Sequence, residues 1–107
     1  MRRGTTPTYT LTIAGYDLTA MTVYVTIKGI FGRTVTKTGN DLTITTDSTG
    51  STIAFRLTQA ETLELLEGKA DVQARFIDAQ GIALATNIGQ IDVERILLPG
   101  EIVYLGD

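Results

Sequence analysis

The sequence contains no cysteine, no histidine and no tryptophan. The missing cysteine excludes disulfides, thiol chemistry and cysteine-bound zinc. The missing histidine removes the commonest general base and the commonest transition-metal ligand. The missing tryptophan removes the strongest cation–π and interface hot-spot residue. Catalysis would then depend on an Asp/Glu pair, or on a serine or threonine nucleophile activated without histidine.

Charge and hydropathy narrow the range of partners further. The net charge is −3, and the nine basic residues are scattered singly except for Arg2 and Arg3. The sequence therefore lacks the basic stripe typical of nucleic-acid binding. No apolar run approaches the ~20 residues of a membrane span, and no apolar stretch follows the two arginines as in a signal peptide. We expect a soluble protein made in the cytoplasm, with neither nucleic acid nor membrane as a partner.

Short threonine-rich segments that alternate apolar and polar residues dominate the chain. Residues 22–28, for example, place Val23, Val25 and Ile27 on one face. Period-2 alternation is typical of strands with one buried and one solvated face. Glycine, asparagine and aspartate turn signals separate the segments. The expected strands cover residues 9–13, 22–28, 33–37, 42–45, 52–57, 71–76, 82–86, 88–93 and 102–105.

One segment breaks the alternation and predicts a short helix near residues 59–67. Thr58 and Glu61 have the spacing of a capping box, in which each side chain binds the other residue's backbone N–H. Leu63 and Leu66 lie three residues apart and share a face, and Gly68 suits the left-handed position after a helix. A helix of two turns is marginal alone, so we expect its leucines to dock on the sheet.

Length and strand spacing predict a single domain. A chain of 107 residues is within the usual size of one domain and can build one core. About seven to nine evenly spaced short strands indicate a mainly β fold, an antiparallel β-sandwich. Residues 1–8 are expected to be a polar, mobile lead-in. Residues 96–107 are expected to form either a terminal hairpin or an arm that pairs with a neighbouring subunit.

Two apolar segments are candidates for contact with a partner. Ile30 and Phe31 occupy the expected tip of a hairpin, where polar residues are usual. Either Phe31 is exposed and anchors a partner, or the tip folds back onto the sheet. Ile102 and Tyr104 lie in the C-terminal run, which would join a strand edge of its own chain or of another.

The sequence contains no motif for catalysis or cofactor binding. No glycine-rich segment ends in Gly-Lys-Ser/Thr, so a phosphate-binding loop is not expected. Most of the acidic residues fall in turns or on the expected helix, where turn chemistry and helix electrostatics account for them. We therefore expect no enzyme, no metal, no cofactor and no small-molecule substrate. A small hydrolase with an Asp/Glu pair stays an alternative.

Several segments together resemble a known group of proteins. They are residues 1–8, 25–28, 33–42, 57–63 and 72–75, which read MRRGTTPT, VTIK, RTVTKTGNDL, LTQAETL and VQAR. They are similar to small β-sandwich proteins of phages and prophages of Gram-positive bacteria, and to the N-terminal immunoglobulin-like domain of siphophage baseplate upper proteins. The resemblance covers nearly the whole chain and implies an immunoglobulin-like sandwich with no catalytic residues to carry over.

The resemblance also implies a role. It predicts a non-enzymatic structural or assembly component of a phage or prophage particle, in its tail or baseplate. Its partners would be other phage structural proteins or further copies of itself, and it would be a virion component assembled in the bacterial cytoplasm. The alternative is a β-sandwich binding module for a carbohydrate or a host cell-surface ligand, using exposed tyrosines.

Overall fold

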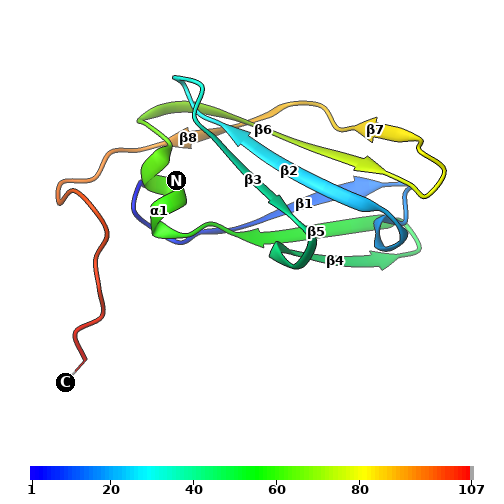
Figure 1. Cartoon of the computed structure of the whole chain (residues 1–107), viewed down its shortest axis with the longest axis horizontal. Helices are drawn as coiled ribbons and strands as arrows, with labels where there is room; N and C mark the ends of the chain where they lie inside the picture. Colours follow the sequence, from blue (N-terminus) through cyan, green and yellow to red (C-terminus); the bar gives the residue numbers. More distant parts are fainter. Residues whose placement is uncertain (107) are drawn as a thin grey trace.

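Two antiparallel sheets face each other in the computed structural model, which describes residues 1–106 (Figure 1). The first sheet has the order β1-β5-β4 and consists of β1 (Thr8–Ala14), β5 (Gly50–Arg56) and β4 (Leu42–Asp47). The second has the order β3-β2-β6 and consists of β3 (Thr34–Thr38), β2 (Thr22–Lys28) and β6 (Gly68–Ile77), with β7 (Ala83–Ala85) and β8 (Gly89–Val93) both paired to β6. The connections include helix α1 (Gln59–Glu64) and the 3₁₀ turns η1 (Leu18–Ala20) and η2 (Gly39–Asp41).

This strand order is that of an immunoglobulin-like sandwich. In that fold strands A, B, E and D form one sheet, and C, F and G form the other with C′ at its edge. Here β1, β5 and β4 take the places of B, E and D, and β3, β2 and β6 take those of C′, C and F. Strands β7 and β8 share the place of G, because they pair with successive parts of β6. The predicted fold class is confirmed.

The core lies between the sheets and follows from the alternation in the sequence. Val23, Val25 and Ile27 of β2 point inward and are buried, whereas Tyr24 and Lys28 point outward and are exposed. A one-residue shift in register would turn every such side chain to the wrong face, so the pattern fixes the pairing. The buried apolar residues are Leu18, Val23, Val25, Ile27, Val35, Leu42, Ile53, Phe55, Leu57, Leu65, Ala70, Val72, Ala74, Phe76 and Val93.

Helix α1 is shorter than the sequence predicts. Its capping box forms as expected, with Glu61 N–H donating to the Thr58 hydroxyl and Thr58 N–H donating to the Glu61 carboxylate. The helix then ends at Glu64, because Leu65 adopts an extended conformation and inserts fully into the core. Gly68 accordingly begins β6 and does not cap the helix.

The N-terminal segment is tied to the domain at both of its ends, unlike the mobile lead-in that the sequence suggests. Arg3 N–H donates to Glu94 O, in a parallel bridge beside the end of β8. The Arg3 side chain donates to the carbonyl oxygens of Leu63 and Leu65, at 2.6 and 2.9 Å, and so satisfies acceptors at the C-terminal end of α1. Thr5 O accepts from the buried Thr62 hydroxyl.

One charged side chain points into the sandwich. Lys37 lies on the same face of β3 as Val35, and its ammonium nitrogen is 2.6 Å from the Glu61 carboxylate. The Lys37 side chain is only 10% exposed. Burial of Glu61 opposes its ionisation, but hydrogen bonds from Lys37 and from Thr58 N–H outweigh that effect and lower the pKa of Glu61. The pair therefore joins β3 to the N-terminal turn of α1.

Replacing Lys37 with alanine should lower the free energy of unfolding by about 2–3 kcal/mol, because it leaves the Glu61 charge partly buried without its partner. Lys69→Ala is the matched control. It removes a lysine–carboxylate pair with Asp92 in which both side chains are more than half exposed, and should change stability far less than Lys37→Ala does. Urea denaturation measures both, and equal losses would contradict the anchoring role of Lys37.

Stability should also fall in acid as Glu61 becomes protonated. In the folded protein the pKa of Glu61 lies below its ordinary value of 4.5. The stability that ionised Glu61 contributes is therefore fully present above pH 4.5, and it is lost as the pH falls through the lower pKa of the folded state. Glu61→Gln keeps a side-chain acceptor for the capping box but cannot titrate. Thermal unfolding from pH 7 to pH 2.5 should therefore show a shallower acid limb for Glu61→Gln, and superimposable limbs would refute this assignment.

Candidate functional site

Exposed apolar side chains gather at the α1 end of the sandwich. The β2–β3 hairpin tip lies at this end, where Arg33 beside the tip forms an ion pair with Glu64 of α1 at 3.2 Å. The chain also leaves β8 at this end and continues as a C-terminal arm, residues 95–106 (Figure 1). The large apolar side chains exposed on the tip and arm are Ile30, Phe31, Leu97, Leu98, Ile102, Val103, Tyr104 and Leu105.

The two residues of the hairpin tip differ in their contacts. Gly29 N–H donates to Arg33 O, and Gly32 N–H donates to Gly29 O, so the turn is closed by its own backbone. The Ile30 side chain leans on Gly68, where an added Cβ would come within 3.1 Å of Ile30 Cδ1. Phe31 points away and is 77% exposed. Of the two alternatives for this tip, the structure has the exposed phenylalanine.

The C-terminal run forms an arm and not a hairpin within residues 96–106. It contains no strand, and Ile96 is its one half-buried residue; Asp107 lies outside the described residues. The amide side chain of Gln59 holds the arm once, accepting from Ile102 N–H at 2.8 Å and donating to Ile102 O at 2.9 Å. Beyond this point Tyr104 and Leu105 are at least 90% exposed.

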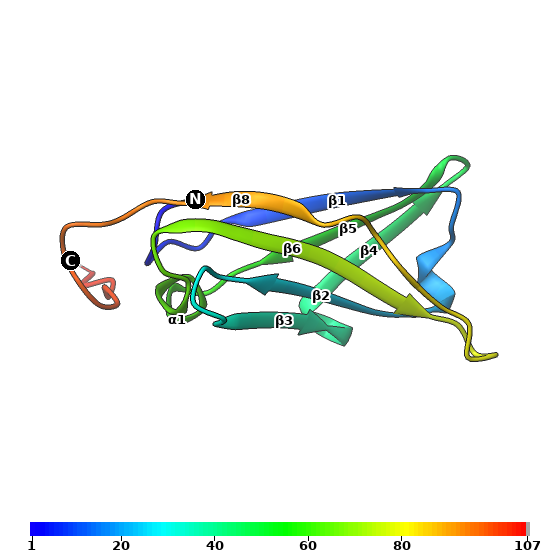
Figure 2. The ribbon, with the colours of Figure 1, turned by 90° about the horizontal axis from the view of Figure 1, so that it is seen from above.

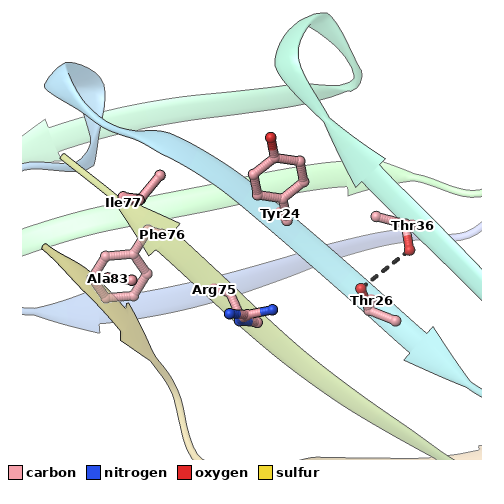
Figure 3. Close-up of a pocket in the computed structure, with 7 residues that line it drawn as sticks. All are labelled: Tyr24, Thr26, Thr36, Arg75, Phe76, Ile77 and Ala83. Carbon is pink, nitrogen blue, oxygen red and sulfur yellow. Dashed lines mark hydrogen bonds between the residues drawn. The ribbon is translucent and has the colours of Figure 1, made fainter. Parts of the chain in front are cut away.

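A shallow pocket of about 400 Å³ lies on the outer face of the second sheet (Figure 3). Tyr24 of β2 is directly opposite Arg75 of β6 in the pairing register. The hydroxyls of Thr26 and Thr36 are 3.1 Å apart and close one side of the pocket. Ring, guanidinium and hydroxyl groups together suit a polar ligand with one apolar face, such as a sugar.

The acidic residues at the other end of the sandwich serve their own turns. Asp17, Asp47 and Asp78 each accept a backbone N–H two residues further on, at 3.0, 2.8 and 2.9 Å. Hydrogen bonds from the hydroxyls of Thr19 and Thr49 lower the pKa of Asp17 and Asp47. A general acid near neutral pH needs a raised pKa, so these carboxylates are poorly suited to that role.

The side chains that usually bind metals do not gather in the part of the chain that the structure describes. Among residues 1–106, no three carboxylates lie together in a group that would hold an ion. The expectation of a protein without catalytic or cofactor chemistry stays a prediction.

Comparison with known proteins identifies no relative. No family model matches the chain, and neither a curated protein nor a solved structure matches it significantly. The resemblance to phage baseplate proteins therefore stays a prediction from sequence. The helices of residues 1–106 include none that is long and apolar enough to span a membrane.

Two residues that make contacts at the α1 end of the sandwich, Lys37 and Gln59, were not singled out from the sequence. Lys37 follows Val35 by two positions, and strand periodicity alone places both on the inner face. That signal was available. Gln59 carries no comparable signal, because its bond to Ile102 spans 43 residues and depends on where the arm crosses α1.

Proposed function

We propose that the chain is a non-enzymatic structural or assembly component of a phage or prophage particle, in the tail or baseplate, that acts through protein–protein contacts. The exposed apolar arm and hairpin tip at one end carry the proposal. Large apolar groups rarely gather on the surface of a protein that works alone, and such patches mark interaction sites. The partners are other structural proteins of the particle or further copies of this chain.

A comparison of the free energy gained by burial with the free-energy cost of association favours an assembly in which the same contact is repeated between many subunits. Burying one large apolar side chain contributes roughly 1.5–3 kcal/mol, so three of them contribute about 5–9 kcal/mol. Association costs about 4–15 kcal/mol in lost freedom of movement. The gain from Phe31, Tyr104 and Leu105 thus falls within the range of that cost. Repeated subunits in a particle supply the extra contacts through multivalency.

Phe31→Asp should weaken self-association at least tenfold, because it places a charge where an apolar anchor is buried. Ile82→Asp is the matched control, since Ile82 is exposed in the β6–β7 turn at the opposite end. Sedimentation equilibrium over a concentration series compares the three proteins, and Ile82→Asp should behave as the unaltered chain. Monomers at every concentration, together with absence from particles purified after prophage induction, would contradict the proposal.

A carbohydrate or cell-surface ligand is the second candidate function, and the pocket of Tyr24 and Arg75 favours it. An aromatic ring packs against the C–H face of a sugar, and an arginine beside it donates to hydroxyl or carboxylate oxygens. Fold by itself does not distinguish this role from the first.

If the pocket binds a sugar, Tyr24→Ala and Arg75→Gln should each abolish the signal of the unaltered protein on a glycan array. Tyr104→Ala serves as the control, because it removes another exposed tyrosine, which lies outside the pocket. A glycan array without signal for the unaltered chain, or one on which Tyr24→Ala binds normally, would eliminate this function.

A further inference from the structure

The core is open along one side of the sandwich. The inward side chains of β1 are Tyr9, Leu11 and Ile13, and all three are only partly buried. Their counterparts on β5, Ile53 and Phe55, are almost completely buried. The difference arises because β1 pairs with β5 alone, so its other edge has no strand beside it in the described chain.

The open edge leads into a cleft between the sheets. The cleft has a volume of about 330 Å³, and Leu11, Thr12 and Ile13 line it from β1. Val72 and Gly89 line it from the facing sheet, at the break between β7 and β8. An immunoglobulin-like sandwich has strand A beside B, and the parallel bridge of Arg2 with Glu94 is the only trace of such a strand in residues 1–106. The cleft therefore has the place and lining for one more strand.

The arm has the properties of the strand that is missing. Residues 102–105 read Ile-Val-Tyr-Leu, a β-branched and aromatic run that favours strand structure. Their side chains are 60–92% exposed. Gln59 holds the backbone at Ile102, and the N–H and C=O groups of the following residues up to Gly106 make no bond within the described chain. An unpaired strand and an unpaired strand edge are the two halves of one β-interaction.

We infer that the C-terminal arm of one copy adds as a strand to β1 and fills the cleft of a second copy. The inference rests on the proposed function and names the partner of the arm. This contact gives the arm a set of backbone hydrogen bonds to β1. It also covers Leu11 and Ile13 with apolar side chains. The same contact closes the exposed β1 edge, which would otherwise recruit strands indiscriminately.

The arm is placed for a second copy because its own cleft lies on the other side of the molecule. Strands β1 and β8 run along one side of the sandwich, and β3 runs along the opposite side (Figure 2). Glu101 lines a pocket with Lys37 and Asp41, at the β3 side. With Ile102 held by Gln59, the four residues after it reach about 14 Å at full extension. The arm runs from the end of β8 toward the β3 side, beyond the α1 end of the sandwich (Figure 2).

The area of the contact favours a reciprocal exchange. A strand points alternate side chains to opposite faces, so two of the four arm side chains enter the cleft and two lie on the outer face of the sheet. Side chains and backbone together then bury roughly 300–400 Å² of the arm, since a single aromatic residue buries about 150–250 Å². The cleft loses a similar area, so two arms exchanged between two copies bury about 1,200–1,600 Å² in total, which is the standard size of a specific interface, and one arm alone buries half of that.

Cysteine cross-linking tests the inference directly, because the chain has no cysteine of its own. One population carries Val103→Cys in the arm, and a second population of different mass carries Thr12→Cys in the cleft. A short bis-maleimide should join them into a covalent heterodimer in high yield. Thr43→Cys on β4 is the matched control, as another exposed threonine on the other edge strand of the same sheet, and should give at least tenfold less product.

The outcomes separate this inference from the proposed function. Equal cross-linking at Thr12→Cys and Thr43→Cys, or closure of a single chain carrying both Val103→Cys and Thr12→Cys at high dilution, would overturn it. Oligomers that depend on Phe31 but give no product at Thr12→Cys would also overturn it, while leaving the assembly role intact. A strictly monomeric chain that never joins a particle would contradict both this inference and the proposed function.

Discussion

Helix α1 is the element on which the arrangement of this protein depends. The Glu61 carboxylate caps the helix and binds Lys37 of β3. Thr62 binds the N-terminal segment, and Gln59 binds the arm. A helix of six residues is too short to be stable alone, so these contacts and the capping box hold it in place. In return it holds the N-terminal segment at Thr5 and the C-terminal arm at Ile102, at one end of the sandwich.

Because the N-terminal segment and the arm both meet α1, most of the exposed apolar side chains of the tip and arm lie at this end of the sandwich. The far end is made of tight turns whose aspartates satisfy local backbone N–H groups, with Tyr16 and Ile82 exposed there singly. The α1 end instead presents Phe31 and the apolar arm. Along the side, β1 leaves a strand edge and a cleft uncovered. A projecting arm and a vacant strand position in one chain suit assembly with a second copy.

Sequence patterns predicted the strands and the helix start well where a pattern was compatible with only one kind of local structure. The alternation of β2 placed its residues 22–28 correctly, and the Thr58–Glu61 capping box located the start of α1. The end of α1 was misplaced, because burial of Leu65 in the core outweighed the helical continuation and the glycine signal at Gly68. The run 102–105 has the propensity of a strand but finds no partner edge within the described chain, so propensity alone overestimated its structure.

The sequence by itself determined the β-sandwich, its inward and outward faces, and the absence of cysteine and histidine chemistry. It also identified Ile30, Phe31, Ile102 and Tyr104 as unusual apolar positions. Only the tertiary structure decided that Phe31 is exposed, that Lys37 pairs with Glu61 and that the core is open beside β1. These features depend on contacts between residues far apart in the chain, and alternation carries information about faces but none about which edges remain unpaired.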